Sequence, residues 1–175
     1  TATVGNSVSS VFVTAIPNEF NAAVLVNGSV IRTVPLSVGN NTVSIQVTSQ
    51  DGTSVLAYTV TVTRQSNDAT LSALTLSNGS LSPSFASGTL AYTASVANAV
   101  STVTVTPTTN DANATVTVNG NPATTPVPLT VGANTVTILV TAQDGTTQSY
   151  TLAVTRAASS DATLSALTLS NGSLS

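Results

Sequence analysis

The fifteen residues Asp161–Ser175, which read DATLSALTLSNGSLS, repeat the segment Asp68–Ser82 without a single change. The two copies begin 93 residues apart, so the chain between them is one full repeat. A period of this length is that of a domain rather than of a solenoid rung. The repeat therefore predicts domain-sized units, with a spare copy of the opening segment at the C-terminus.

The sequence before Asp68 is a shortened copy of the same repeat. The segment PLSVGNNTVSIQVTSQDGT at Pro35–Thr53 matches PLTVGANTVTILVTAQDGT at Pro128–Thr146. This copy starts at Thr1, which aligns with Thr93, so the counterpart of the opening segment is missing from it. The chain thus contains one complete unit and one unit without its head.

The composition favours strands over helices. Charged residues make up only 5% of the chain, far below the roughly 25% usual in soluble domains, and Thr, Ser and Asn take their place on the surface. Val and Thr are strand formers, and apolar residues such as Val136, Ile138 and Val140 alternate with polar ones. No segment shows helical periodicity. In the complete unit the pattern predicts strands at residues 70–77, 90–96, 101–106, 114–119, 127–131, 134–142 and 148–156.

Short strands with one apolar face and turns between them are typical of a β-sandwich. We therefore predict an all-β chain of two tandem Ig-like sandwiches and a donor strand. Residues 1–67 form a sandwich that lacks its first strand, and residues 68–160 form a complete one. Residues 161–175 form a C-terminal strand that completes the open sandwich of a neighbouring subunit.

A sandwich without one strand has an open sheet edge and a slot in its core. The tail should fit that slot, because the same fifteen residues fill it in the complete unit. Fifteen extended residues reach at most about 50 Å, and a whole domain separates the tail from its own open unit, so donation to another subunit is expected. By parity, Leu167 and Leu169 should lie on one face of the donated strand, with Leu164 and Leu174 as outlying anchors. A bend or bulge is expected at Leu164, which is off parity with Leu167. The predicted anchors of the donated strand are Leu164, Ala166, Leu167, Leu169 and Leu174.

The residue inventory excludes several classes of chemistry. The chain has no His, no Lys and no Cys, which removes Ser-His-Asp and Ser-Lys catalysis, thiolate chemistry, disulfides and Lys–Asn crosslinks. Three arginines form no basic patch for nucleic acid, and no apolar run is long enough to span a membrane. The absence of Met, with Thr1 first, is typical of a processed secreted chain or of a piece of a longer protein.

Six acidic residues are the only candidates for metal binding or for glycoside chemistry. Calcium at a domain junction needs several clustered oxygens, and paired carboxylates need a cleft with aromatic residues nearby. The acids are scattered and the chain has no Trp, so roles in turns and caps are favoured, and no catalytic, cofactor or metal residue is predicted. The six are Glu19, Asp51, Asp68, Asp111, Asp144 and Asp161.

Two further residue types recur at equivalent places in the two units. Tyr58 and Tyr150 precede the last strand, where a core tyrosine similar to a tyrosine corner is expected. Arg64 and Arg156 end that strand and are expected to be solvated or to brace a junction. N-x-S/T sequons also occur, but a composition rich in Thr, Ser and Asn produces them by chance; they begin at Asn27, Asn40, Asn78, Asn113 and Asn171.

The order of the motifs resembles a known family. LSALTLSNGSLSPSF, LAYTASV, TVTVNG and PLTVGANTVTILVTAQDGTTQSYTLAVTR follow one another as in the cadherin-like β-sandwich domain found in tandem on bacterial secreted and surface proteins. The resemblance covers Asp68–Arg156 and, without the first segment, Thr1–Arg64. It implies an Ig-like fold in an extracellular, multi-domain setting and no enzyme activity.

These observations lead to two hypotheses. The first is a structural subunit of an extracellular bacterial filament, a head-to-tail homopolymer assembled by strand donation, whose only expected partner is itself. The second is a segment of a long covalent tandem array that serves as a surface stalk or adhesin. A surface ligand remains open in either case.

Overall fold

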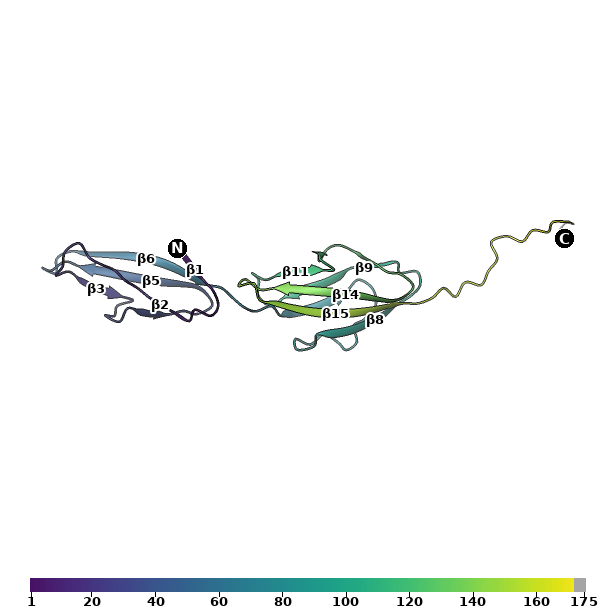
Figure 1. Ribbon diagram of the computed structural model, residues 1–175, viewed down its shortest axis with the longest axis horizontal. Coiled ribbons are helices and arrows are strands. Elements are labelled where there is room, and N and C mark those ends of the chain that lie inside the picture. The colour runs from purple at the N-terminus through teal and green to yellow at the C-terminus, as the bar shows by residue number, and fades with distance from the viewer. Residues whose placement is uncertain (172–175) are drawn as a thin grey trace.

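The computed structural model describes residues 1–171, which contain fifteen strands and no helix. The prediction of an all-β chain is therefore confirmed. Figure 1 shows two elongated groups of strands that follow one another along the long axis, with residues 161–171 extending beyond the second group. We call residues 1–67 the N-terminal region, residues 68–160 the central region and residues 161–175 the C-terminal segment.

Six strands lie in the N-terminal region. Its four-stranded sheet has the order β1-β6-β5-β3, and β2 pairs with β4 in a separate two-stranded ladder. The β1–β6 pair is parallel and the others are antiparallel. The strand bounds are β1 Ala2–Val4, β2 Ser10–Phe12, β3 Ala23–Val26, β4 Thr33–Pro35, β5 Gly39–Thr48 and β6 Val55–Arg64. The buried residues between these strands form a small core of Val26, Val34, Leu36, Val43, Ile45 and Val62.

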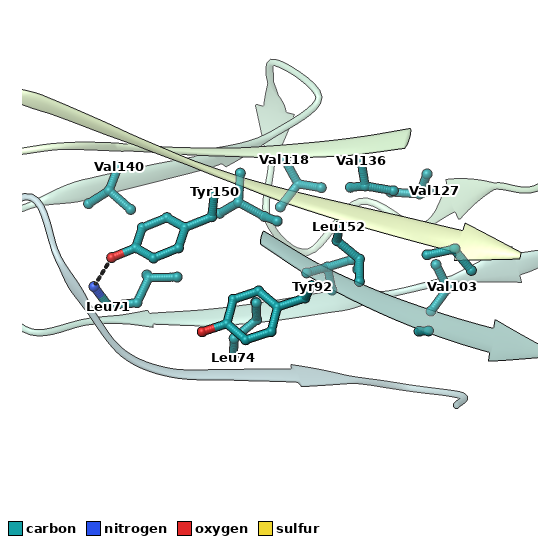
Figure 2. Packing of buried hydrophobic residues seen from close by; sticks show 14 of the residues in the cluster. Leu71, Leu74, Tyr92, Val103, Val118, Val127, Val136, Val140, Tyr150 and Leu152 are labelled. Atoms are coloured by element: carbon teal, nitrogen blue, oxygen red, sulfur yellow. Dashed lines mark hydrogen bonds between the residues drawn. The ribbon is translucent and has the colours of Figure 1, made fainter. Parts of the chain in front are cut away.

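Nine strands lie in the central region. A five-stranded sheet of order β12-β11-β14-β15-β8 faces the ladders β10-β7 and β13-β9. The bounds are β7 Leu71–Leu76, β8 Ala91–Val96, β9 Thr102–Val103, β10 Val105–Thr109, β11 Thr115–Val118, β12 Asn121–Pro122, β13 Val127–Pro128, β14 Gly132–Thr141 and β15 Thr147–Arg156. Figure 2 shows their side chains interdigitating in a core that includes Leu71, Leu74, Tyr92, Val136, Tyr150 and Leu152.

An asparagine fixes the turn that leads into the first strand of the long hairpin in each region. The side chain of Asn134 donates to the carbonyl oxygens of Thr130 and Gly132 at 2.8 and 3.0 Å and accepts from the Thr130 N–H at 2.9 Å. Asn41 makes the equivalent contacts with Ser37 and Gly39. The glycine of this motif has a φ of +93° in Gly132, a left-handed conformation that favours glycine. The V-G-x-N-T motif therefore sets where β5 and β14 begin.

The arginine that ends the last strand ties two loops to that strand in both regions. Arg156 donates from Nε to the Asn98 oxygen at 2.9 Å and from Nη1 to the Leu129 oxygen at 2.8 Å. Arg64 makes the same pair of contacts with the oxygens of Asn6 and Leu36. The expected solvated or junction-bracing arginine thus serves as a clamp within its own region.

The connection between the regions rests on the β14–β15 turn. The N–H of Ser66 donates to Gln143 Oε1 at 3.2 Å, and the N–H of Asp144 donates to the Ser66 oxygen at 3.0 Å. The Gln65 amide donates to the Gln143 oxygen at 3.0 Å. The hairpin turn of the central region therefore lies beside the C-terminal end of β6.

Candidate functional site

Strand β7 shows how the repeated segment packs when it is docked. Its Leu71 and Leu74 are almost completely buried, and it pairs antiparallel with β10. The register shifts after the Ala73–Thr108 pair, so that Leu71 lies opposite Thr109 and Ser72 is the extra residue of a bulge. The bulge turns two leucines three positions apart toward the core. It lies next to the leucine that corresponds to Leu164, where the sequence predicted a bend.

A tyrosine hydroxyl closes the start of this strand. Tyr150 Oη accepts a hydrogen bond from the Leu71 N–H at 3.0 Å, and both residues are buried (Figure 2). A buried N–H without a partner would cost free energy, so this contact satisfies a group that the bulge withdraws from the ladder. The expected core tyrosine is confirmed for Tyr150, whose partner is β7, and is wrong for Tyr58, which is exposed.

The equivalent positions of the N-terminal region are uncovered. Tyr58 aligns with Tyr150 and is 54% exposed, whereas Tyr150 is 0% exposed. Val60 aligns with Leu152 and is 37% exposed, against 0% for Leu152. The segment 13–17, which aligns with β10, forms no strand. Apolar side chains that face a core in the central region thus face solvent here.

Two adjoining hollows mark the place where a strand equivalent to β7 would lie. One has a volume of about 470 Å³ and the other about 240 Å³, and Ile45 lines both. Tyr58 and Ile16 line the first, and Val60 lines the second. We call the combined feature the acceptor groove; its apolar lining includes Val13, Ile16, Ile45, Val47, Tyr58 and Val60.

The rim of the acceptor groove carries large apolar residues that the sequence reasoning did not single out. Phe12 and Ile16, which line the hollows, are well exposed and align with Thr104 and Thr108 of the central region. Phe20, which aligns with Ala112, is also exposed but lines neither hollow. A position-by-position comparison of the two repeats would have found them, because the large apolar residue occurs only in the headless copy. The groove is therefore more apolar at its rim than its covered counterpart.

Residues 161–171 of the C-terminal segment are undocked in this structure. Residues 161–171 form no strand, and Leu164, Ala166, Leu167 and Leu169 are exposed. Figure 1 shows the segment leading away from both groups of strands, so it does not bring these predicted anchors to the acceptor groove. Leu174, the fifth predicted anchor, lies outside the described residues.

The start of the C-terminal segment already has the local structure of the docked copy. Asp161 Oδ1 accepts from the Thr163 N–H at 2.8 Å and from Thr163 Oγ1 at 2.6 Å. Asp68 Oδ1 accepts from the N–H and hydroxyl of Thr70 in the same way. The threonine hydroxyl, followed by the threonine N–H, lowers the pKa of each aspartate. This turn is thus built by local sequence and needs no partner.

Other acids also serve in turns, as the sequence favours. Asp51 accepts from Ser49 Oγ at 2.6 Å and from the Thr53 N–H at 3.0 Å, and the Ser49 hydroxyl is the largest cause of its lowered pKa. Asp144 accepts from the Thr146 N–H at 2.9 Å. Within residues 1–171 no three acids gather in a group that could hold a metal ion.

Comparison with known proteins identifies the domain type. The family model described as "Cadherin-like beta sandwich domain" matches residues 1–65 and 71–157. No curated protein matches the sequence. Among the described residues, no helix is long and apolar enough to cross a membrane.

Two solved structures with similar folds share little sequence with this chain. One is PcdhgB3 EC1-4, with 9% identity, a TM-score of 0.39 and coverage of 89% of this chain and 48% of that one, so the chain spans about half its length. The other contains fibronectin(III)-like modules of Clostridium thermocellum CbhA, with 11% identity, a TM-score of 0.30 and coverage of 89% and 90%.

Proposed function

The chain belongs to the cadherin-like β-sandwich domain family, and on that premise we propose that it is a structural subunit of an extracellular bacterial filament. Domains of this family are typically extracellular and structural or adhesive. Residues 161–175 of one copy would fill the acceptor groove of the next copy. The subunit binds only itself in this assembly and carries no catalytic residue.

We assign the two regions to separate sandwich domains, residues 1–67 and residues 68–160. Each has its own cluster of buried apolar residues, and in the described part of the chain no strand of one region pairs with a strand of the other. The central region contains β7, the strand formed by the repeated segment. The N-terminal region lacks one strand.

A single observation carries the proposal. The groove left open in the N-terminal region corresponds to the site that β7 occupies in the central region, and the C-terminal segment has the sequence of β7 and the residues around it. An extended segment that completes a neighbour's sheet is an established mode of assembly between protein subunits.

The direction of the strand decides which copy donates it. The first leucine of β7 lies beside Tyr150, near the β14–β15 turn, so a donated strand must enter the N-terminal region near its β5–β6 turn. That turn lies at the pole farthest from the central region, whereas the C-terminal segment leaves the opposite end of the molecule (Figure 1).

The C-terminal segment of the same chain cannot reach the β5–β6 turn. The connection 157–160 has four residues and reaches about 14 Å, whereas each ten-residue strand pair along the way is about 33 Å long. The tail of a second copy, aligned end to end with the N-terminal region of the first, meets the groove directly. The contact is head to tail and does not close, so repetition generates a filament.

The donated strand has enough apolar surface for a stable contact. Leu164 and Leu167 correspond to the buried Leu71 and Leu74, and burying each is worth about 1.5–3 kcal/mol. Each ladder hydrogen bond adds about 0.5–1.5 kcal/mol. The ordering of the tail offsets part of this gain.

The alternative is a segment of one covalent tandem array that forms a stalk or adhesin. It is supported by the connection Gln65–Asn67, which already joins a β6 end to a β7 start within one chain. The mass of fully denatured filament separates the two: strand exchange gives the mass of a single subunit, and a covalent array gives a much larger chain.

Deletion of Asp161–Ser175 tests the proposal. Subunits without the segment should remain folded in the central region and form no filaments in electron micrographs. An excess of a synthetic peptide with the sequence of residues 161–175 should cap the full-length chain and shorten its filaments, whereas a scrambled peptide should not. Filaments of normal length from the deleted chain would overturn the proposal.

A further inference from the structure

Apolar anchors alone define the register of the donated strand only weakly. A slip of one residue would turn its leucines to the wrong face, but a slip of two residues keeps the faces. It would place Leu169 in the site meant for Leu167 and Ala166 in the site meant for Leu164. A polar contact that depends on sequence is needed to exclude this slipped state.

The central region contains such a contact at the start of β7. Asn110 Nδ2 donates to Asp68 Oδ2 at 2.7 Å, and the Asn110 N–H donates to the Thr70 oxygen at 2.9 Å. The other carboxylate oxygen of Asp68 is occupied by Thr70. The amide of Asn110 thus binds the carboxylate of Asp68, the acidic residue that precedes the buried leucines of β7.

Both halves of this contact recur on the surfaces proposed to meet. Asn18 aligns with Asn110 and lines the acceptor groove beside Tyr58. Within residues 1–171 its side chain makes no hydrogen bond of its own. Asp161 holds Thr163 through Oδ1, as Asp68 holds Thr70, and no described residue donates to its Oδ2.

We propose, on the basis of the strand donation above, that Asn18 sets the register of the donated strand by donating its amide to Asp161 Oδ2 of the incoming copy. Leu164 then lies at Tyr58, whose hydroxyl accepts the Leu164 N–H as Tyr150 accepts that of Leu71. Tyr58 alone cannot set the register, because every residue of a slipped strand also presents an N–H. A slip of two residues brings Thr163 opposite Asn18 and removes the carboxylate.

Two cysteine pairs report the register, because the chain has no native cysteine. Ala73 and Thr108 are cross-strand partners, so Ala166 and Ile16 should be partners in the proposed register. Thr168 would take that place after a slip of two. Chains with Ile16→Cys plus Ala166→Cys, or Ile16→Cys plus Thr168→Cys, are assembled, oxidised and run without reductant.

In the native background the 16/166 pair should give a ladder of linked subunits and the 16/168 pair little. Adding Asn18→Ala should raise the ratio of slipped to in-register product about tenfold, the effect of losing one charge-assisted hydrogen bond. The matched control Asn110→Ala removes the same contact in the central region and should leave the ratio unchanged. Assembly that is lost with Asn18→Ala and kept with Asn110→Ala also supports the contact.

An exchange of partners tests whether the two residues act on each other. Asn18→Asp combined with Asp161→Asn keeps one amide and one carboxylate and should restore the native ratio. A dominant 16/168 ladder in the native background, or a ratio that does not respond to Asn18→Ala, would overturn the register assignment and leave strand donation standing. If neither pair crosslinks and filaments form without the tail, strand donation itself fails.

Discussion

The N-terminal and central regions are two copies of one pattern with different degrees of completion. Their longest hairpins, β5–β6 and β14–β15, have ten paired positions each. Yet β15 alternates between buried and exposed residues along its length, whereas most of β6 is exposed. The ladder is intact in both, so the difference comes from what covers the sheet.

The polar contacts that shape the turns and strand ends are the same in both regions, whereas the burial of the strands differs. Asn41 and Asn134 fix the same turn, and Arg64 and Arg156 clamp the same loops, in both regions. These polar contacts are local or lie within the region, so they are present in the N-terminal region although its strands include no equivalent of β7. Tyr150 is buried beside β7, whereas Tyr58 has no such strand beside it and is exposed.

The largest expected difference in stability is between substitutions of Leu74 and Leu167, which occupy equivalent positions in the two copies of the repeated segment. Leu74→Ala removes a buried side chain from the central core and should lower its free energy of unfolding by about 2–5 kcal/mol. Leu167→Ala changes the same letter in the exposed copy and should leave the unfolding of unassembled subunits unchanged. It should weaken filament formation instead.

Denaturant unfolding of dilute subunits measures the first effect, and the critical concentration for assembly measures the second. Equal destabilisation of subunits by both substitutions would mean that the tail packs on its own chain. The two copies of the repeated segment would then both be buried in the unassembled subunit.

The sequence was sufficient for the strands and turns because these follow from local pattern. Alternation placed β14 and β15 within a residue or two, and the turn between them contains Gly145 with a φ of +90°, a conformation that favours glycine. The strand expected at 101–106 is instead two, β9 and β10, and the second continues to Thr109. Pairing with β7 extends this strand to Thr109, and the alternation of apolar and polar residues does not predict which strands pair.

The candidate site was predicted only in part, because the alternation pattern does not show how one strand packs against another. Repetition identified the missing head and its spare copy, but parity suggested that Leu167 and Leu169 share the inward face. In the docked copy the bulge at Ser72 gives the deepest burial to the leucines that correspond to Leu164 and Leu167. Docking of the tail itself stays a prediction.

A smaller effect is expected from the two tyrosines. Tyr150→Phe leaves the buried Leu71 N–H without its acceptor and should cost the central region about 1–3 kcal/mol in unfolding experiments. Tyr58→Phe should not change the unfolding of unassembled subunits, because its hydroxyl lies at an open groove. It should raise the critical concentration of assembly. If Tyr58→Phe lowered the free energy of unfolding of unassembled subunits, this assignment would be wrong.

The smallest expected effect concerns pH and the two aspartates that begin the repeated segment. Hydrogen bonds from Thr70 and Asn110 lower the pKa of Asp68 in the folded chain, so its contribution is present above the unfolded value of about 3.9 and is lost as the pH falls through the folded pKa. Asp68→Asn should therefore flatten the loss of central-region stability between about pH 5 and pH 2.

Asp161→Asn is the matched control for that experiment. Its carboxylate also has a lowered pKa, but it lies in a segment that does not pack on either region, so unfolding of subunits should keep its native pH profile. Filament stability should respond to both acid and Asp161→Asn, because the proposed docking places this carboxylate against Asn18. A subunit pH profile altered equally by the two substitutions would show that the tail already contributes to the fold before assembly.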